Sequence, residues 1–119
     1  GAIVDLKLLN SARPSEVQKA ISDFGYYIQA KTYRNGAHLL TGFVPDFIFV
    51  VAQKTEPYTV SVHRLRPEAL EAAQVRIDFA LDRYRKAQES GEWPGYERIY
   101  SQGLTPWERI KTEGIENAE

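Results

Sequence analysis

Residues Asp46–Gln53 read DFIFVVAQ, an almost unbroken run of apolar, β-branched and aromatic side chains. Such a run is typical of a strand at the centre of a sheet with both faces covered, because a half-exposed strand alternates apolar and polar residues. After a turn, residues 58–65 (YTVSVHRL) alternate more clearly and predict a strand with one wetter face. The two segments together predict an antiparallel hairpin.

The segments on either side of this hairpin complete an α/β pattern. Ala2–Leu9 (AIVDLKLL) predicts another largely buried strand. Between it and the hairpin we expect a short helix over residues 16–24 and a longer one over residues 26–40, with a weak point at Gly36. Pro67–Ser90 predicts a long helix after the hairpin. The predicted order is therefore β-α-α-β-β-α, a mixed sheet flanked by helices.

Composition narrows the classes of function. The chain has 119 residues, enough for one core, and a formal net charge of −1, so binding to DNA would need a local basic groove. It contains no cysteine and two histidines, which excludes thiolate chemistry and argues against a histidine-rich metal site. No apolar run approaches the roughly 20 residues that span a bilayer, and we expect a cytoplasmic protein. Because the chain lacks Met and opens with Gly before a strand, we expect the C-terminal portion of a longer domain.

The first strand contains an acid and a lysine that could share one reacting centre. Asp5 and Lys7 are two residues apart, so on a strand their side chains point to the same face. A carboxylate can hold a divalent cation, and an ammonium can orient a water or stabilise charge that develops on a phosphate. The alternative is a surface ion pair, which the short pattern alone favours.

The second helix offers a glutamine and a tyrosine on one face. Gln29 and Tyr33 are four residues apart and therefore neighbours on a helix. The amide can bond a phosphate, and the tyrosine can contact a phosphate or stack on a base. Taken alone, this pair is better explained as a surface glutamine and a core tyrosine.

In this order the two motifs resemble the PD-(D/E)xK nucleases of the RecB type, and more closely the RecE-like exodeoxyribonuclease VIII family of phage and prophage proteins. The resemblance rests on VDLK at 4–7, ISDFGYYIQAKTY at 21–33, FIFVVAQKTEPYTVSVHRL at 47–65 and GEWPGY at 91–96. It implies a restriction-endonuclease-like α/β fold that lacks its N-terminal half. Residues 1–96 would be the C-terminal portion of the nuclease domain. Residues 97–119 would be an acidic tail that wraps the surface, contacts a subunit or is partly disordered.

The resemblance also implies roles for individual residues. Asp5 would be a metal-binding acid and Lys7 the catalytic lysine, with Gln29 and Tyr33 as further catalytic residues that contact DNA. The implied activity is Mg²⁺-dependent digestion of linear double-stranded DNA from 5′ to 3′, with Mn²⁺ as a substitute, which leaves 3′ single strands for recombination. The implied partners are DNA ends, the upstream half of the domain, further copies in a ring and a single-strand annealing protein. From their charge, Lys31 and Lys54 are expected to line the DNA path.

Two departures keep alternatives open. Leu8 and Leu9 stand where the family has two threonines, and only four residues precede Asp5, so the family's first metal-binding acid is not in this chain. A nuclease-like fold can persist as a non-catalytic module that binds DNA ends or assembles oligomers. A third interpretation is a fragment of a recombination protein that is inert by itself.

Overall fold

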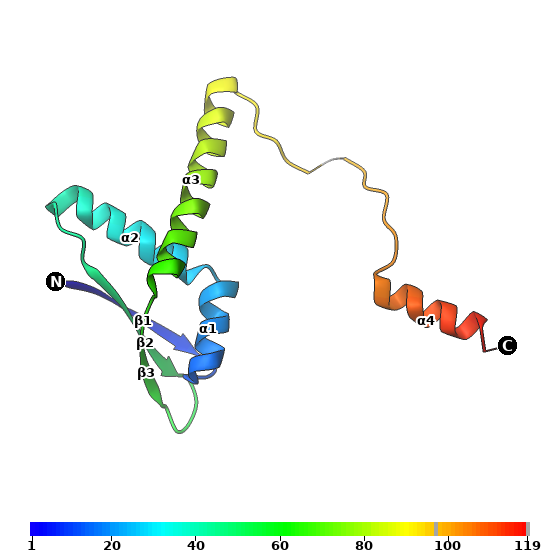
Figure 1. Cartoon of the computed structure of the whole chain (residues 1–119), viewed down its shortest axis with the longest axis horizontal. Coiled ribbons are helices and arrows are strands. Elements are labelled where there is room, and N and C mark those ends of the chain that lie inside the picture. Colours follow the sequence, from blue (N-terminus) through cyan, green and yellow to red (C-terminus); the bar gives the residue numbers. More distant parts are fainter. Residues whose placement is uncertain (97, 119) are drawn as a thin grey trace.

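The computed structural model describes residues 1–96 and 98–118, and it contains a three-stranded sheet and four helices. In chain order these are β1 (Ala2–Leu9), α1 (Pro14–Asp23), α2 (Tyr26–Thr41), β2 (Asp46–Gln53), β3 (Val60–Arg64), α3 (Pro67–Ser90) and α4 (Pro106–Glu116) (Figure 1). β2 lies at the centre, parallel to β1 and antiparallel to β3. The predicted mixed α/β sheet, the central strand and the antiparallel hairpin are confirmed.

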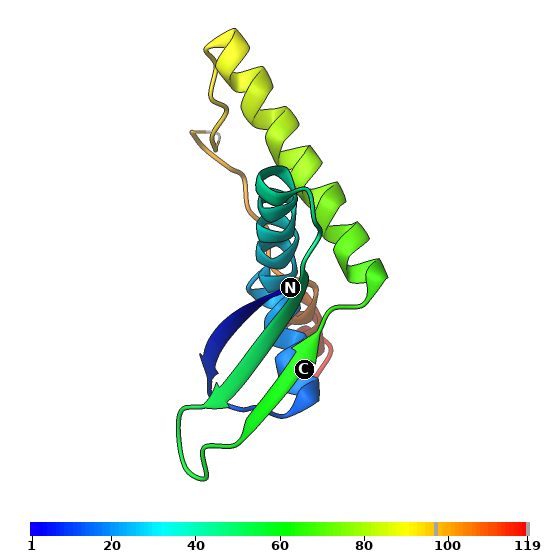
Figure 2. The ribbon, with the colours of Figure 1, turned by 90° about the vertical axis from the view of Figure 1, so that its left-hand side faces the viewer.

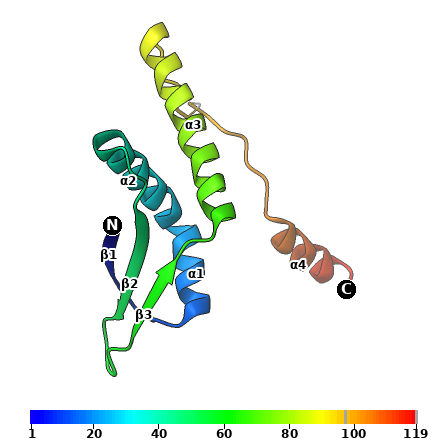
Figure 3. The same cartoon turned by 60° about the vertical axis from the view of Figure 1, so that its left-hand side comes forward.

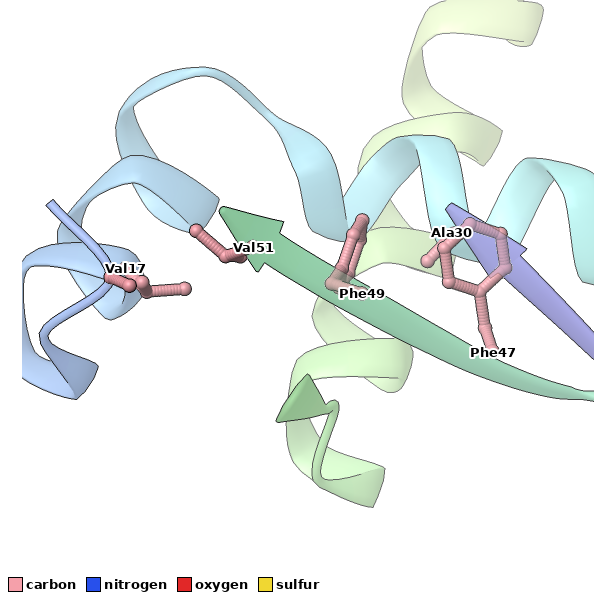
Figure 4. Close-up of a cluster of buried hydrophobic side chains, with 6 residues drawn as sticks. Val17, Ala30, Phe47, Phe49 and Val51 are labelled. Atoms are coloured by element: carbon pink, nitrogen blue, oxygen red, sulfur yellow. The ribbon is translucent and has the colours of Figure 1, made fainter. Parts of the chain in front are cut away.

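The helices α1 and α2 cross over from β1 to its parallel neighbour β2 and cover one face of the sheet (Figure 2). Because strand residues alternate between faces, Phe47, Phe49 and Val51 of β2 all point toward these helices, where at most 3% of each is exposed. They pack with Val17 of α1 and Ala30 of α2 (Figure 4). The core therefore lies between the sheet and the two crossover helices.

The opposite face of the sheet is apolar and open. Figure 3 shows the helices gathered on one side of the three strands, and no described helix lies over the other side. Val4, Leu6 and Leu8 of β1 are each about 60% exposed, and so are two valines of β3. The expectations that β1 is largely buried and that β2 is covered on both faces are therefore wrong for this chain. An apolar strand is expected to have other elements packed on both of its faces. The described residues provide helices for one face of this sheet only.

β3 also differs from its prediction. It is shorter than residues 58–65, because Tyr58 has a φ of +58°, which takes it out of extended backbone. The alternation predicts that the polar residues face solvent, but Ser61 and His63 point toward the helices while the valines face outward. The Ser61 hydroxyl donates to the Ala12 carbonyl at 2.7 Å, and His63 Nε2 lies 2.7 Å from the same hydroxyl. Because the single hydroxyl proton is committed to Ala12, this pair joins β3 to the loop before α1 and is not a nucleophile with its base.

α2 continues without a break through Gly36 to Thr41, so the expected weak point does not interrupt it. The positive φ of +78° at Gly42 then ends the helix. α3 packs against α2, and the Asn35 amide donates to Gln74 at 3.0 Å across that contact. These contacts hold α2 between the sheet and α3.

The tail contains a helix that the sequence analysis did not predict. α4 begins after Thr105, whose hydroxyl accepts a hydrogen bond from the Glu108 N–H at 3.4 Å. The sequence TPWE at 105–108 has the form of a capping box with Pro at the first helical position, and it could have identified this start. Figure 1 shows α4 held away from the sheet, and the Cα radius of gyration of 21.1 Å exceeds the roughly 13 Å expected for a compact chain of this length. Glu97 and Glu119 of the acidic tail lie outside the described residues.

Candidate active site

Asp5 and Lys7 lie on the face of β1 that the helices cover. Their register partners on β2 are Phe49 and Val51, which belong to the buried core. The side chain of Asp5 is 23% exposed and that of Lys7 is 17% exposed. The pair is therefore set at the edge of the core on a rigid strand, and not on the open surface.

The Lys7 ammonium has three neighbours that fix its position. It lies 3.0 Å from Asp5 Oδ2, donates to Gln29 Oε1 at 2.7 Å, and sits 4.2 Å from the centre of the Tyr26 ring. Tyr26 and Gln29 are three residues apart on α2, so the helix presents both side chains to β1. Charge, hydrogen bond and the negative face of the ring all act on one ammonium group.

Gln29 must turn its oxygen toward Lys7, because an ammonium has donors and no acceptor. The Gln29 amide NH₂ is then left as a donor, and no described residue accepts from it. A hydrogen-bond donor beside a fixed cation suits an anionic group such as a phosphate.

One oxygen of Asp5 is held against the lysine. Oδ2 is buried and lies 3.0 Å from the Lys7 ammonium, in an ion pair rather than a hydrogen bond of regular geometry. The ammonium therefore compensates the charge of this carboxylate at the edge of the core.

A carboxylate oxygen is the ligand type that Mg²⁺ prefers, and Asp5 fits as one ligand of such an ion. The described residues contain no group of three or more His, Asp or Glu side chains placed to hold a metal. A set of three such protein ligands would therefore need at least one group from outside this described part of the chain.

The other predicted site residues are more dispersed. Tyr33 lies one turn beyond Gln29, 51% exposed, with its ring 6.3 Å from that of Phe47. Lys31 is about 200° around α2 from Gln29, on a different side of the helix. Lys54 follows the end of β2, and its N–H donates to the Leu9 carbonyl at 2.9 Å. The structure brings Asp5, Lys7 and Gln29 together, whereas direct contacts of Tyr33, Lys31 and Lys54 with them are not found among the described residues.

The sequence analysis missed Tyr26. Its ring packs on Phe49, with 6.1 Å between ring centres, while the same ring lies beneath the Lys7 ammonium. The signal was available, because Tyr26 precedes Gln29 by three residues and so shares its helix face. What the sequence could not show is that this face meets β1 at Lys7.

The comparisons with known proteins identify the family of the chain. Residues 1–101 match the family described as "PDDEXK-like domain of unknown function (DUF3799)". No curated protein matches the sequence.

None of the described helices has the length and apolar character needed to cross a membrane.

A crystal structure described as a "Putative exonuclease" from Eubacterium rectale is similar to this chain, with a TM-score of 0.66 and 18% sequence identity. The match covers 91% of this chain and 46% of that one, so the chain spans about half the length of the protein it resembles. The two share a fold across nearly all of this chain. The family match over residues 1–101 shows that the chain belongs to the PDDEXK-like family, within the PD-(D/E)xK nuclease superfamily.

Proposed function

We propose that this chain is the catalytic portion of a RecE-like nuclease that digests linear double-stranded DNA from 5′ to 3′ and leaves 3′ single strands for recombination. The observation that supports it most is the largely buried Asp5 carboxylate 3.0 Å from a Lys7 ammonium that Gln29 holds in place. The enzyme would act in the cytoplasm with a single-strand annealing protein, and further copies of the chain would form a ring around the DNA.

In this proposal Asp5 is one ligand of Mg²⁺, or of Mn²⁺ in its place. When bound, the ion would neutralise phosphate charge and make a water molecule more acidic. Lys7 stabilises the charge that develops on the scissile phosphate, and its position is kept by Gln29 and Tyr26. The Gln29 amide NH₂ donates to a phosphate oxygen of the DNA. Tyr33, half-exposed one turn further along α2, contacts the end of the same DNA strand.

An upstream segment of the same domain is part of the proposal. One carboxylate holds Mg²⁺ poorly, because the ion needs six oxygen ligands and in such sites more than one acid. The open face of the sheet is equally incomplete, since three residues of β1 expose about 60% of apolar side chains there. Because Asp5 points to the opposite face, a segment that covers the open face would have to continue past the outer edge of β1 to add a second acid beside Asp5.

The test uses linear duplex DNA labelled at the 5′ or the 3′ end, with Mg²⁺, and the chain combined with the upstream segment of its parent protein. We expect release of 5′ nucleotides and a loss of at least about 100-fold in rate for Asp5→Asn and for Lys7→Met. The matched controls are Asp82→Asn and Lys86→Met, since these residues form an exposed ion pair at 2.8 Å on α3. Their rates should equal that of the unaltered protein. Cleavage that survives Asp5→Asn would refute the assignment of the site.

A non-catalytic module that binds DNA ends is the second candidate. It is supported by the absence, among the described residues, of three or more His, Asp or Glu side chains placed to hold a metal. It is also supported by Leu8 and Leu9, which stand where the RecE-like family has two threonines. Binding of DNA ends in Ca²⁺, with no cleavage by the combined segments in Mg²⁺ or Mn²⁺, would favour this candidate over the enzyme.

A further inference from the structure

A groove of about 530 Å³ opens beside the catalytic pair, at the carboxyl ends of β1 and β2. Its floor is formed by the end of β1 and the loop after it, and its walls by α1, by the turn into α2 and by Lys54. The carboxyl ends of parallel strands are where open α/β sheets bind ligands, and the volume falls within the ~300–1,000 Å³ of small-molecule sites.

Two aromatic rings stand along this groove. Phe24, in the turn between α1 and α2, is 69% exposed, and its ring centre lies 5.7 Å from that of Tyr26. Tyr26 also contacts the Lys7 ammonium at 4.2 Å. One ring therefore separates the groove from the catalytic lysine, so a ligand in the groove would be a near neighbour of the reacting phosphate.

The charges along the groove are mixed. Lys54 is exposed and forms no ion pair among the described residues, whereas Lys19 is paired with Asp23 on the surface of α1. Glu16, in the first turn of α1, adds a negative charge to the lining of the same groove. A phosphate beside Lys54 would gain a counter-ion, and the surface pair of Lys19 costs little to open.

We infer that this groove binds one nucleotide of a single DNA strand next to the scissile phosphate, with its base stacked on Phe24 and its phosphate beside Lys54. Exposed aromatic rings beside basic side chains are the usual means of holding single strands without reading their sequence. The inference rests on the proposed function, because it takes the strand held in the groove to be the one that Asp5 and Lys7 process.

The test measures fluorescence anisotropy of a labelled 12-nucleotide oligothymidylate with the 119-residue chain in EDTA, which prevents cleavage. We expect Phe24→Ala to weaken binding about 5- to 150-fold, because one stacked base is worth about 1–3 kcal/mol. Lys54→Gln should also weaken binding and make it less sensitive to salt, because one phosphate contact is lost. Phe24→Trp should keep the affinity of the unaltered chain, because an indole ring can also stack on a base. Glu16→Gln should tighten binding a few-fold, a change of sign that general loss of structure cannot produce.

The controls are Phe79→Ala and Lys86→Gln, an exposed aromatic residue and an exposed lysine on α3, which should bind as the unaltered chain does. Asp5→Asn should keep its affinity for the oligonucleotide while it abolishes cleavage by the combined segments. Unaltered affinity in Phe24→Ala, or no binding of the oligonucleotide by the chain, would overturn the inference. If Asp5→Asn still abolishes cleavage in that case, the proposed function stands without the groove.

Discussion

Asp5 and Lys7 should be strongly coupled and yet contribute little net stability to the fold, because the cost of burying the two charges offsets their attraction. Lys7→Met removes the hydrogen bond to Gln29 and leaves the Asp5 carboxylate at the edge of the core without its counter-ion. Because both side chains are about one-fifth exposed, we expect about 2–3 kcal/mol of destabilisation, below the 3–5 kcal/mol of a fully buried pair. Asp5→Leu should cost about 1–2 kcal/mol, since Gln29 and Tyr26 still hold the lysine.

The double variant Asp5→Leu/Lys7→Met should be more stable than the less stable single variant. It loses the hydrogen bond to Gln29, worth about 1 kcal/mol, and adds apolar surface beside the core residues Phe49 and Val51. We expect it within about 1 kcal/mol of the unaltered chain. The two single effects sum to about 3–5 kcal/mol, so the coupling free energy should be about 2–6 kcal/mol.

The assay is urea unfolding in EDTA, followed by far-UV circular dichroism. Tryptophan fluorescence is unsuitable because Trp93 and Trp107 both lie beyond α3, away from the sheet. The same cycle at Asp82 and Lys86, an exposed pair, should show coupling near zero. If the two single changes at Asp5 and Lys7 simply add in the double variant, the pair is not coupled in the way its burial and contacts require.

Two further predictions concern the support of the site. Phe49→Ala should destabilise the chain by about 3–5 kcal/mol in the same urea assay, because the ring is 1% exposed at the centre of the core. Phe79→Ala, at 61% exposure, should change stability by less than about 1 kcal/mol, and equal effects of the two would contradict the placement of the core. Gly25→Ala should cost about 1–2 kcal/mol, since Gly25 has a φ of +69° directly before Tyr26. Gly36→Ala should instead stabilise by about 0.5–1 kcal/mol, because Gly36 lies inside α2 with open space where a Cβ would stand, and a loss of stability there would show that the helix is not regular at this point.

Much of the fold follows from local patterns in the sequence. The apolar run of β2 predicts the central strand, and Pro67 and Gly91 mark the two ends of α3. The alternation of side chains along a strand also predicts that Asp5 and Lys7 share one face of β1. These features depend on neighbours along the chain, so one sequence is enough to predict them.

Local patterns gave the wrong answer where burial depends on distant segments. Ser61 and His63 look like the solvent face of β3, yet they face the helices, because the Ala12 carbonyl offers Ser61 a hydrogen bond there. Leu6 looks buried and is 64% exposed, because the described residues contain no element that covers its face. The hydrophobicity of a side chain determines how much free energy its burial would release. Whether it is buried depends on whether another segment packs against it.

For the site, the amino-acid order defines which groups are available: an acid and a lysine on one strand face, and a glutamine and a tyrosine on one helix face. Which of these groups meet depends on tertiary packing. The contact of α2 with β1 brings Gln29 within 2.7 Å of Lys7 and places the Tyr26 ring beneath its ammonium, which also lies 3.0 Å from Asp5 Oδ2. The reason is physical, since spacing along one element sets the direction of a side chain, whereas a contact across elements depends on how their buried faces pack together.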